Sequence, residues 1–252
     1  MMTLDAGRVA YSLPGGDKVA ALSSAEMREV DRIAVEEMGP ALLQMMEHAG
    51  RSLAVLAIRA VRDVYPGGRT VILAGPGGNG GGGICAARHL AWRLDEVELV
   101  LSAPEADLSA AAAGQLALYR ATGRDVLPSQ ELERRGPPNL VIDALLGYGL
   151  RGPPRGETER LIGWANGSGS RILALDLPSG THPDTGDAPG ARIRAAATLT
   201  LHMPKPGLRD PAAGRLYLAD IGIPACVTGR IGVEPPSYGP AFIVPLERPA
   251  TS

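Results

Sequence analysis

The sequence predicts an α/β protein with a mainly parallel sheet that is covered by helices on both faces. Two observations lead to this fold class. From residue 70 to residue 222, short runs of apolar β-forming residues alternate with helical patterns. The runs are apolar throughout instead of alternating with polar residues, which is typical of strands buried on both faces. Aromatic residues make up only 4% of the chain, so we expect a core of Ala, Leu, Val and Ile.

The composition restricts the class of protein. The chain has 252 residues, of which 45% are hydrophobic and 21% are charged, as in ordinary globular domains. Its formal net charge is -2 with basic and acidic residues interspersed, which argues against binding to nucleic acids or membrane surfaces. The cysteines Cys85 and Cys226 lack the paired spacing of zinc sites, which favours a reducing, cytoplasmic location. We also expect neither a signal peptide nor a membrane-spanning helix.

The N-terminal part predicts a loose arm over residues 1–20 and two helices over residues 23–39 and 40–65. Ser23 and Glu26 have the spacing of a capping box at the start of the first helix. The apolar stripe of this helix consists of Met27, Val30, Ala34 and Met38. The second helix is apolar around much of its circumference, so we expect it to be largely buried.

The remaining chain alternates between the two kinds of element. Strands are expected over residues 70–75, 96–102, 139–145, 171–180, 197–203 and 215–222. Helices are expected over residues 83–94, 106–123 and 157–168. We expect one domain over residues 1–252, with a core over about residues 22–224. A proline-rich tail over about residues 233–252 is expected to trail over the surface.

A glycine-rich segment follows the first of these strands. Glycine occupies seven of the nine positions from Gly75 to Gly83, and the exceptions are Pro76 and Asn79. Glycines between a strand and a helix let the backbone approach a phosphate at the positive end of the helix. The segment matches neither the GxGxxG fingerprint nor a P-loop. We interpret it as a ligand-binding loop, with a tight structural turn as the alternative.

Polar side chains stand at the ends of three expected strands. They are Asn79, Asp143 and Ser179. Ligands bind at the carboxyl edge of open parallel sheets, so we expect these side chains to face one site. Their amide, carboxylate and hydroxyl oxygens suit a weakly charged cation better than zinc. Taken singly, Asp143 could instead cap a loop, and Ser179 could stabilise a turn.

The other candidate residues carry weaker signals. The histidines lack the spacing of a metal pair, and we interpret His48 and His89 as structural. A hydrolase triad is not expected, because the chain lacks the G-x-S-x-G elbow. Lys205 follows a strand, where a lysine is usually a solvated charge but could contact an anionic ligand.

Seven motifs occur in order between about Leu22 and Pro224. They read SSAEMREVDRIAVEEMG, LLQMMEHAGR, GPGGNGGGGICAARHL, VIDALLGYGLRGP, LALDLPSGTHPDTGD, MPKPGL and ADIGIP. Each motif is weak alone, but together they resemble one family. It is the family of the NAD(P)H-hydrate epimerases, also called the YjeF N-terminal domain family.

The resemblance implies a three-layer α/β/α Rossmann-like fold and a homodimer. The implied activity is the interconversion of the R and S epimers of hydrated NADH and NADPH, a nicotinamide nucleotide repair reaction. A separate NAD(P)H-hydrate dehydratase, which this chain is too short to contain, would be its functional partner. One potassium ion per subunit would be held by Asn79, Asp143 and Ser179, and Asp143 would perform acid–base catalysis. The implied substrate-binding residues are Gly78, Asn79, Gly80, Gly81, Gly82, Gly147, Tyr148, Gly149, Leu150, Arg151, Gly152, Pro153 and Asp176.

The glycine segment departs from the usual family pattern, GPGNNGGDG. Gly78 replaces the first asparagine and Gly82 replaces the aspartate, while His48 is a lesser departure at a position where asparagine is frequent. The lost carboxylate favours an alternative hypothesis, a catalytically silent nucleotide-binding or scaffold domain of the same fold. The retained Asn, Asp and Ser favour the epimerase. A small-molecule kinase is disfavoured, because the chain lacks a phosphate-binding lysine motif.

Overall fold

The computed structural model describes residues 8–62, 68–150 and 152–249. Its main sheet has the strand order β4-β3-β5-β6-β7-β8-β9. The strands are β3 (Thr70–Ala74), β4 (Val97–Leu101), β5 (Leu140–Ala144), β6 (Arg171–Leu175), β7 (Ala197–Leu201), β8 (Arg215–Ala219) and β9 (Ile243–Leu246). Neighbouring strands are parallel except for the pair β8 and β9. Strand order reverses at β3, so the crevice expected to hold a ligand lies at the carboxyl ends of β3 and β5.

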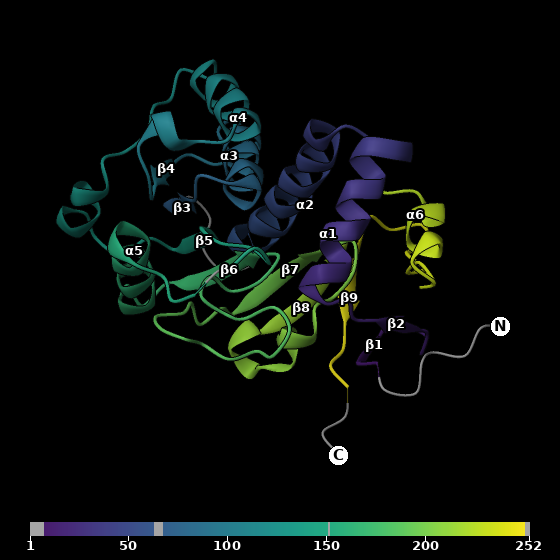
Figure 1. The fold of residues 1–252 in the computed structure, drawn as a ribbon. Helices are drawn as coiled ribbons and strands as arrows, with labels where there is room; N and C mark the ends of the chain where they lie inside the picture. The colour runs from purple at the N-terminus through teal and green to yellow at the C-terminus, as the bar shows by residue number, and fades with distance from the viewer. Residues whose placement is uncertain (1–7, 63–67, 151, 250–252) are drawn as a thin grey trace.

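Helices cover both faces of this sheet (Figure 1). They are α1 (Ser24–Arg32), α2 (Leu42–Arg62), α3 (Gly78–Leu90), α4 (Ala110–Arg120), α5 (Gly156–Gly167) and α6 (Ala225–Arg230). Because side chains alternate along a strand, Ile72 and Ile142 belong to the core cluster that includes side chains of α1 to α4, whereas Val71 and Val141 belong to the cluster that includes side chains of α5. The predicted three-layer α/β/α class is confirmed. Among the described residues, no helix is both long enough and apolar enough to cross a membrane.

The first helix begins as its sequence predicts. The Glu26 backbone N–H donates to Ser23 Oγ at 3.3 Å, and Glu26 Oε2 accepts from the Ser23 backbone N–H at 2.8 Å. This reciprocal pair is the capping box. The helix then widens into a π-helical turn over Ile33–Met38 before Gly39. The predicted helix over residues 23–39 is therefore correct in extent but not uniform in type.

Both terminal segments are more ordered than their composition suggested. Residues expected to form a loose arm instead make an antiparallel hairpin, β1 (Ala10–Ser12) with β2 (Lys18–Ala20). The Tyr11 ring is fully buried, and its hydroxyl donates to the Lys205 carbonyl at 3.0 Å. Within the expected trailing tail, β9 adds to the sheet beside β8. Burial of apolar side chains at both ends outweighs the flexibility that proline and glycine indicated; residues 1–7 and 250–252 lie outside the described chain.

The glycine segment is mostly helix, which corrects the predicted loop. Helix α3 begins at Gly78, so only the residues before it form a turn. A Cβ atom on Gly80 would lie 1.7 Å from the Gly75 carbonyl oxygen, and one on Gly83 would lie 2.4 Å from the Ala144 Cβ. The sheet itself therefore approaches this backbone. Glycine is unfavourable inside a helix by about 1 kcal/mol, and the close packing of α3 against β3 and β5 accounts for its use here.

Candidate active site

The carboxyl ends of β3, β5 and β6 carry the three predicted cation ligands. Asp143 is the penultimate residue of β5 and pairs in register with Leu73 of β3 and Ala174 of β6. Asn79 lies in the first turn of α3, directly after β3, and Ser179 lies in the segment after β6. The parallel sheet thus brings residues that are far apart in sequence to one edge.

A direct contact joins Asp143 and Ser179. The Ser179 hydroxyl donates to Asp143 Oδ1 at 2.5 Å, and the Ser179 backbone N–H donates to Oδ2 at 2.8 Å. The Leu145 backbone N–H also donates to Oδ1, at 3.2 Å. Both side chains are buried. Asp143 therefore caps the backbone N–H groups of Leu145 and Ser179, as the alternative interpretation allowed, while its carboxyl group also lies at the predicted ligand-binding edge.

Burial sets the proton affinity of this carboxyl group. It raises the pKa of Asp143 to about 6, and the hydrogen bonds from Ser179 and Leu145 oppose that rise. A carboxyl group with a pKa close to neutrality populates both its protonated and its ionised form. Such a group can donate or accept a proton during a reaction, and raised carboxyl pKa values are common at catalytic sites.

Asn79 approaches the same edge from α3. Its Nδ2 atom is buried, and no other described residue offers it a hydrogen-bond partner. A Cβ atom on Gly147 would lie 3.3 Å from Asn79 Cγ and Oδ1, so the loop after β5 passes directly beside the amide. The amide oxygen and nitrogen of asparagine are similar in size, so a rotation of the amide group by 180° exchanges their positions without changing the packing. The buried polar position can therefore present an oxygen to a cation.

The other predicted substrate-binding residues divide into buried and accessible groups. Gly80, Gly81 and Gly82 are buried within α3, where protein atoms account for their missing side chains. Gly78, Gly149, Gly152 and Pro153 are exposed, and Gly147, Tyr148 and Leu150 are half-buried. Arg151 lies outside the described residues. Ligand contact by these residues stays a prediction.

Lys205 is not a solvated loop charge. It is fully buried, and its Nζ atom lies 2.5 Å from Asp176 Oδ1 and 3.1 Å from the Leu201 carbonyl oxygen. Asp176, at the carboxyl end of β6, has a left-handed backbone with φ of 68° and is itself buried. The lysine thus neutralises one of the predicted substrate-binding residues. Burial of such a pair at a sheet edge is a property of the tertiary structure, which the lone Lys in the sequence did not reveal.

Tyr148 connects this ion pair to α1. Its ring centroid lies 5.9 Å from Lys205 Nζ, within the range of a cation–π contact. Its hydroxyl donates a hydrogen bond to Asp31 Oδ2. Burial raises the pKa of Asp31, which the Tyr148 hydrogen bond opposes, and burial likewise raises the pKa of the Tyr148 hydroxyl.

Sequence reasoning missed Asp31. The signal available was its position: Asp31 follows Met27 by four residues and precedes Ala34 by three, so it falls on the apolar stripe of the first helix. A carboxylate on a buried helix face needs a polar partner. Here the partner is Tyr148, which comes from the loop after β5.

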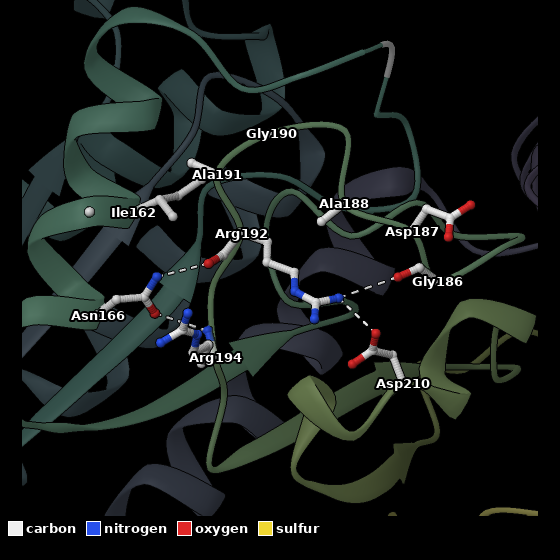
Figure 2. A pocket seen from close by; sticks show the side chains of 11 residues that line it. Ile162, Asn166, Gly186, Asp187, Ala188, Gly190, Ala191, Arg192, Arg194 and Asp210 are labelled. Atoms are coloured by element: carbon white, nitrogen blue, oxygen red, sulfur yellow. Dashed lines mark hydrogen bonds and ion pairs between the residues drawn. The ribbon is translucent and has the colours of Figure 1, made fainter.

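A separate pocket of about 570 Å³ lies beside α5 and the loop that precedes β7 (Figure 2). Its lining residues are Ile162, Gly163, Asn166, Gly186, Asp187, Ala188, Gly190, Ala191, Arg192, Arg194 and Asp210. Arg192 Nη1 is already paired with Asp210 Oδ2 at 2.7 Å, and Asn166 binds the backbone of Arg192 and Arg194. These contacts hold the loop in place. None of the predicted site residues lines this pocket, so the carboxyl edge of the sheet remains the candidate active site.

Known proteins resemble this chain over most of its length. The family model described as YjeF-related protein N-terminus matches residues 42–207. The NAD(P)H-hydrate epimerase of Dehalogenimonas lykanthroporepellens is 44% identical over 225 residues, which cover 89% of this chain and 91% of the relative. The Bifunctional NAD(P)H-hydrate repair enzyme Nnr of Hyperthermus butylicus is 41% identical over 213 residues, which cover 81% of this chain but only 38% of that longer protein. The crystal structure of the yeast protein ynu0 has a TM-score of 0.77 at 24% identity, covering 89% of this chain and 99% of its own, and supports the fold. This chain belongs to the YjeF-related N-terminal domain family.

Proposed function

We propose that this chain is an NAD(P)H-hydrate epimerase, an isomerase that interconverts the R and S forms of hydrated NADH and NADPH. The observation that carries the proposal is the buried Asp143 carboxyl group, held by Ser179 at the switch point of the sheet. The names of relatives that align with nearly the whole chain support the same activity. The alternative of a silent scaffold domain has no comparable support.

Asp143 is the acid–base group of this proposal. Epimerisation inverts the ring carbon that carries the added hydroxyl group. The protonated carboxyl group gives its proton to the departing hydroxyl, which leaves as water while the electron pair of the adjacent ring nitrogen stabilises the cation. Water then adds to the opposite face of the ring and returns a proton to the carboxylate. A pKa of about 6 supplies both forms of Asp143 that these steps require.

The nucleotide part of the substrate would lie across the same edge. The first backbone N–H groups of α3, at Gly78 and Asn79, have no partner within the helix and form the positive end of its dipole. Such a terminus favours a phosphate group. The exposed residues Gly149, Gly152 and Pro153, which follow β5, would offer further contacts. The paired Asp176 and Lys205 would position hydroxyl groups of the substrate without placing an uncompensated charge beside them.

We further propose a potassium site formed by Asn79, Asp143 and Ser179. The chemistry of the set fits this ion, because all three side chains offer oxygen atoms and only one carries a charge. The buried Asn79 Nδ2 atom, which has no hydrogen-bond partner among the described residues, marks a position where a ligand would be favourable. When bound, potassium would supply positive charge beside the phosphates and the ionised carboxylate.

An epimer assay tests the activity. Mixed R and S hydrates are supplied with an S-specific dehydratase, and consumption of the R form is followed with and without this protein. We expect complete consumption only when this protein is present. If the R form persists with the folded wild-type protein at high concentration, the epimerase proposal is wrong. Asp143→Asn, which keeps the shape of the side chain, serves as the inactive control.

Ion replacement tests the potassium site. We expect the rate and the thermal stability of the wild-type protein to rise with potassium more than with lithium at equal ionic strength. Asn79→Ala should remove that difference in both measurements. Equal responses to the two ions, in a protein that is active, would leave the epimerase standing and eliminate the cation site.

We also propose a functional partner and a cellular location for this chain. A separate dehydratase would consume the S epimer, an arrangement consistent with the bifunctional names of longer relatives. The free cysteines Cys85 and Cys226 suit the reducing cytoplasm.

We also propose a homodimer, because the exposed apolar side chains around the start of α2 form a candidate contact surface. These are Val35, Met38, Leu42 and Leu43. Light scattering of the wild type and of Leu43→Glu should show a dimer and a monomer, respectively.

A further inference from the structure

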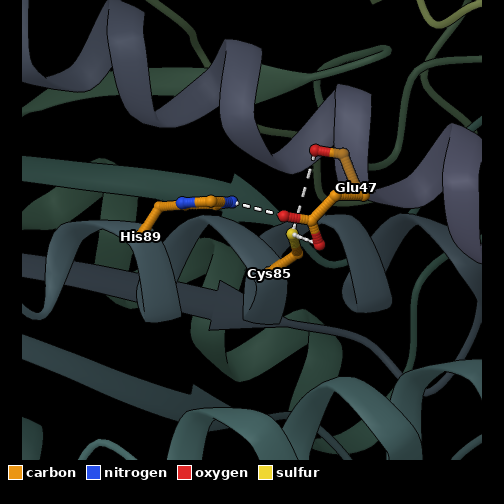
Figure 3. A group of neighbouring side chains, drawn as sticks. All are labelled: Glu47, Cys85 and His89. Carbon is orange, nitrogen blue, oxygen red and sulfur yellow. Dashed lines mark hydrogen bonds and ion pairs between the residues drawn. The ribbon is translucent and has the colours of Figure 1, made fainter.

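A group of three potential metal ligands lies between α2 and α3 (Figure 3). Glu47 comes from α2, whereas Cys85 and His89 come from α3. One ligand atom from each, a carboxylate oxygen, the sulfur and a ring nitrogen, lies within 4.8 Å of the other two. Cys85 Sγ is 3.3 Å from Glu47 Oε2, and His89 Nε2 is 2.7 Å from Glu47 Oε1.

The helical spacing produces this arrangement. Cys85 and His89 are four residues apart, so they lie on one face of α3, one turn from each other. That face packs against α2, and Glu47 of α2 points towards it. The sequence alone does not reveal this group of three ligands, because Glu47 lies on a different helix, 38 residues before Cys85.

We propose that Glu47, Cys85 and His89 form a binding site for a zinc-type divalent cation. Zinc accepts nitrogen, sulfur and carboxylate ligands, and three protein ligands leave one coordination position for water. Bonds of the usual lengths place tetrahedral ligand atoms about 3.3–3.6 Å apart. The Cys85 Sγ–Glu47 Oε2 separation of 3.3 Å lies in this range, whereas the His89 Nε2–Glu47 Oε1 separation of 2.7 Å is shorter, so the ring and the carboxylate must move apart to admit an ion. Glu47 is 41% exposed, which gives the ion a path from solvent.

The protonation states of Cys85 and Glu47 determine how many protons are released when a cation binds. Burial and the nearby Glu47 carboxylate raise the pKa of the Cys85 thiol to about 12, so the free protein holds the proton. Burial of Glu47 is outweighed by hydrogen bonds from Arg88, His89 and Cys85, which lower its pKa to about 2 and keep it ionised. Binding of the cation to sulfur therefore releases the thiol proton to solvent.

Arg88 is the competing cation. Its Nη2 atom lies 2.5 Å from Glu47 Oε2 and 3.5 Å from Cys85 Sγ. It neutralises the carboxylate in the metal-free protein. Glu47 Oε1 faces His89, so the carboxylate can bind a metal through Oε1 while Oε2 keeps its hydrogen bond to Arg88.

The site is separate from the carboxyl edge. Cys85 follows Asn79 by six residues of α3, a distance of about 9 Å along the helix axis at about 1.5 Å per residue. Metal at this site would join α2 to α3 without touching Asp143 or Ser179. Its presence or absence therefore does not depend on the proposed epimerase activity.

Cobalt titration tests the sulfur and nitrogen ligands. With Co²⁺ as the probe, the wild type should develop a thiolate charge-transfer band that saturates at one ion per chain and disappears when Zn²⁺ is added. Cys85→Ser and His89→Gln should lose the band and weaken binding by more than the roughly 10- to 100-fold cost of an outer-shell partner. Cys226→Ser changes the other, exposed cysteine and should behave as the wild type. Equal binding by Cys85→Ser, or loss of the band in Cys226→Ser, would overturn the site.

Calorimetric Zn²⁺ titrations of the wild type and of ligand and Arg88 variants provide an independent test of the site. Zn²⁺ titrations in two buffers of different ionisation enthalpy should report about one proton released per ion in the wild type and none in Cys85→Ser. Arg88→Gln removes the competing charge and should bind Zn²⁺ more tightly, whereas Glu47→Gln should bind it more weakly. Thermal melts without metal show whether each variant is folded. Zinc binding by folded protein without proton release would exclude Cys85 as a ligand.

Discussion

Ser179 holds both oxygens of the Asp143 carboxyl group, Oδ1 through its hydroxyl at 2.5 Å and Oδ2 through its backbone N–H at 2.8 Å. The two residues are 36 positions apart and meet because β5 and β6 are adjacent parallel strands. The contact fixes the orientation of a buried acid at the carboxyl edge of the sheet.

Replacing Asp143 should separate activity from stability. We expect Asp143→Asn to lower the epimerisation rate by about 10²- to 10⁴-fold, the usual contribution of a positioned acid or base. Ser179→Ala should reduce activity less, because the Ser179 and Leu145 backbone N–H groups still hold the carboxyl group. The coupled epimer assay and urea unfolding measure the two effects. Wild-type rates in folded Asp143→Asn would eliminate its acid–base role.

The buried Lys205–Asp176 pair should be more important for stability than surface ion pairs. Lys205→Met leaves Asp176 buried without compensation, which should cost about 3–5 kcal/mol of unfolding free energy. The double variant Lys205→Met/Asp176→Asn should cost less than the sum of the single changes, since it removes both charges. Arg120→Met, at an exposed pair with Glu105, is the matched control and should have little effect. Additive losses in urea unfolding would contradict the coupling.

Gly82 should limit the native rate. An aspartate there would restore the family pattern at the N-terminal half of α3, and a tenfold gain in rate needs only about 1.4 kcal/mol. Its backbone permits a side chain, since its φ is not left-handed, but the new Cβ would lie 2.8 Å from Leu175 Cδ2. We therefore expect Gly82→Asp to gain activity and to lose about 1–3 kcal/mol of stability through crowding.

Two variants control for this crowding. Gly82→Asp/Leu175→Val should recover part of the lost stability, because it removes a methylene group beside the new side chain. Gly78→Asn, at the other departure, has open space around its Cβ and should melt close to the wild type. A folded Gly82→Asp protein with an unchanged rate would show that the missing aspartate does not limit catalysis.

Acid should destabilise the fold through His202. Its ring is buried, and burial together with the charge of Lys205 lowers its pKa to about 3. The unfolded chain takes up this proton near pH 6.5, so the contribution to stability is complete above that pH and is lost as pH falls towards 3. The slope from this one group approaches about 1.4 kcal/mol per pH unit.

His202→Asn should flatten this pH dependence. Asparagine tolerates the left-handed backbone at position 202, where φ is 59°, and does not titrate. His48→Asn, at an exposed histidine, should leave the slope unchanged. Urea unfolding at about pH 7 and about pH 5 measures the difference. Equal slopes for the wild type and His202→Asn would rule out His202 as the titrating group.

The order of strands and helices could be predicted from the sequence because those signals are local. Apolar runs marked β3 to β8, a capping box marked the start of α1, and polar residues after strands marked the edge that holds Asp143. The family could also be recognised, since its motifs are short and lie mostly at strand ends. Each of these features depends on residues close together in the chain.

Only the tertiary structure decided which groups meet and which become buried. Local sequence indicated a ligand-binding glycine loop, a solvated Lys205 and loose termini, whereas long-range packing produced the first turns of α3, a buried ion pair and the strands β1 and β9. The partners Asp31 and Tyr148 are 117 positions apart, and Glu47 meets Cys85 across two helices. Burial depends on the neighbours that the fold supplies, and it changes both conformational preference and proton affinity.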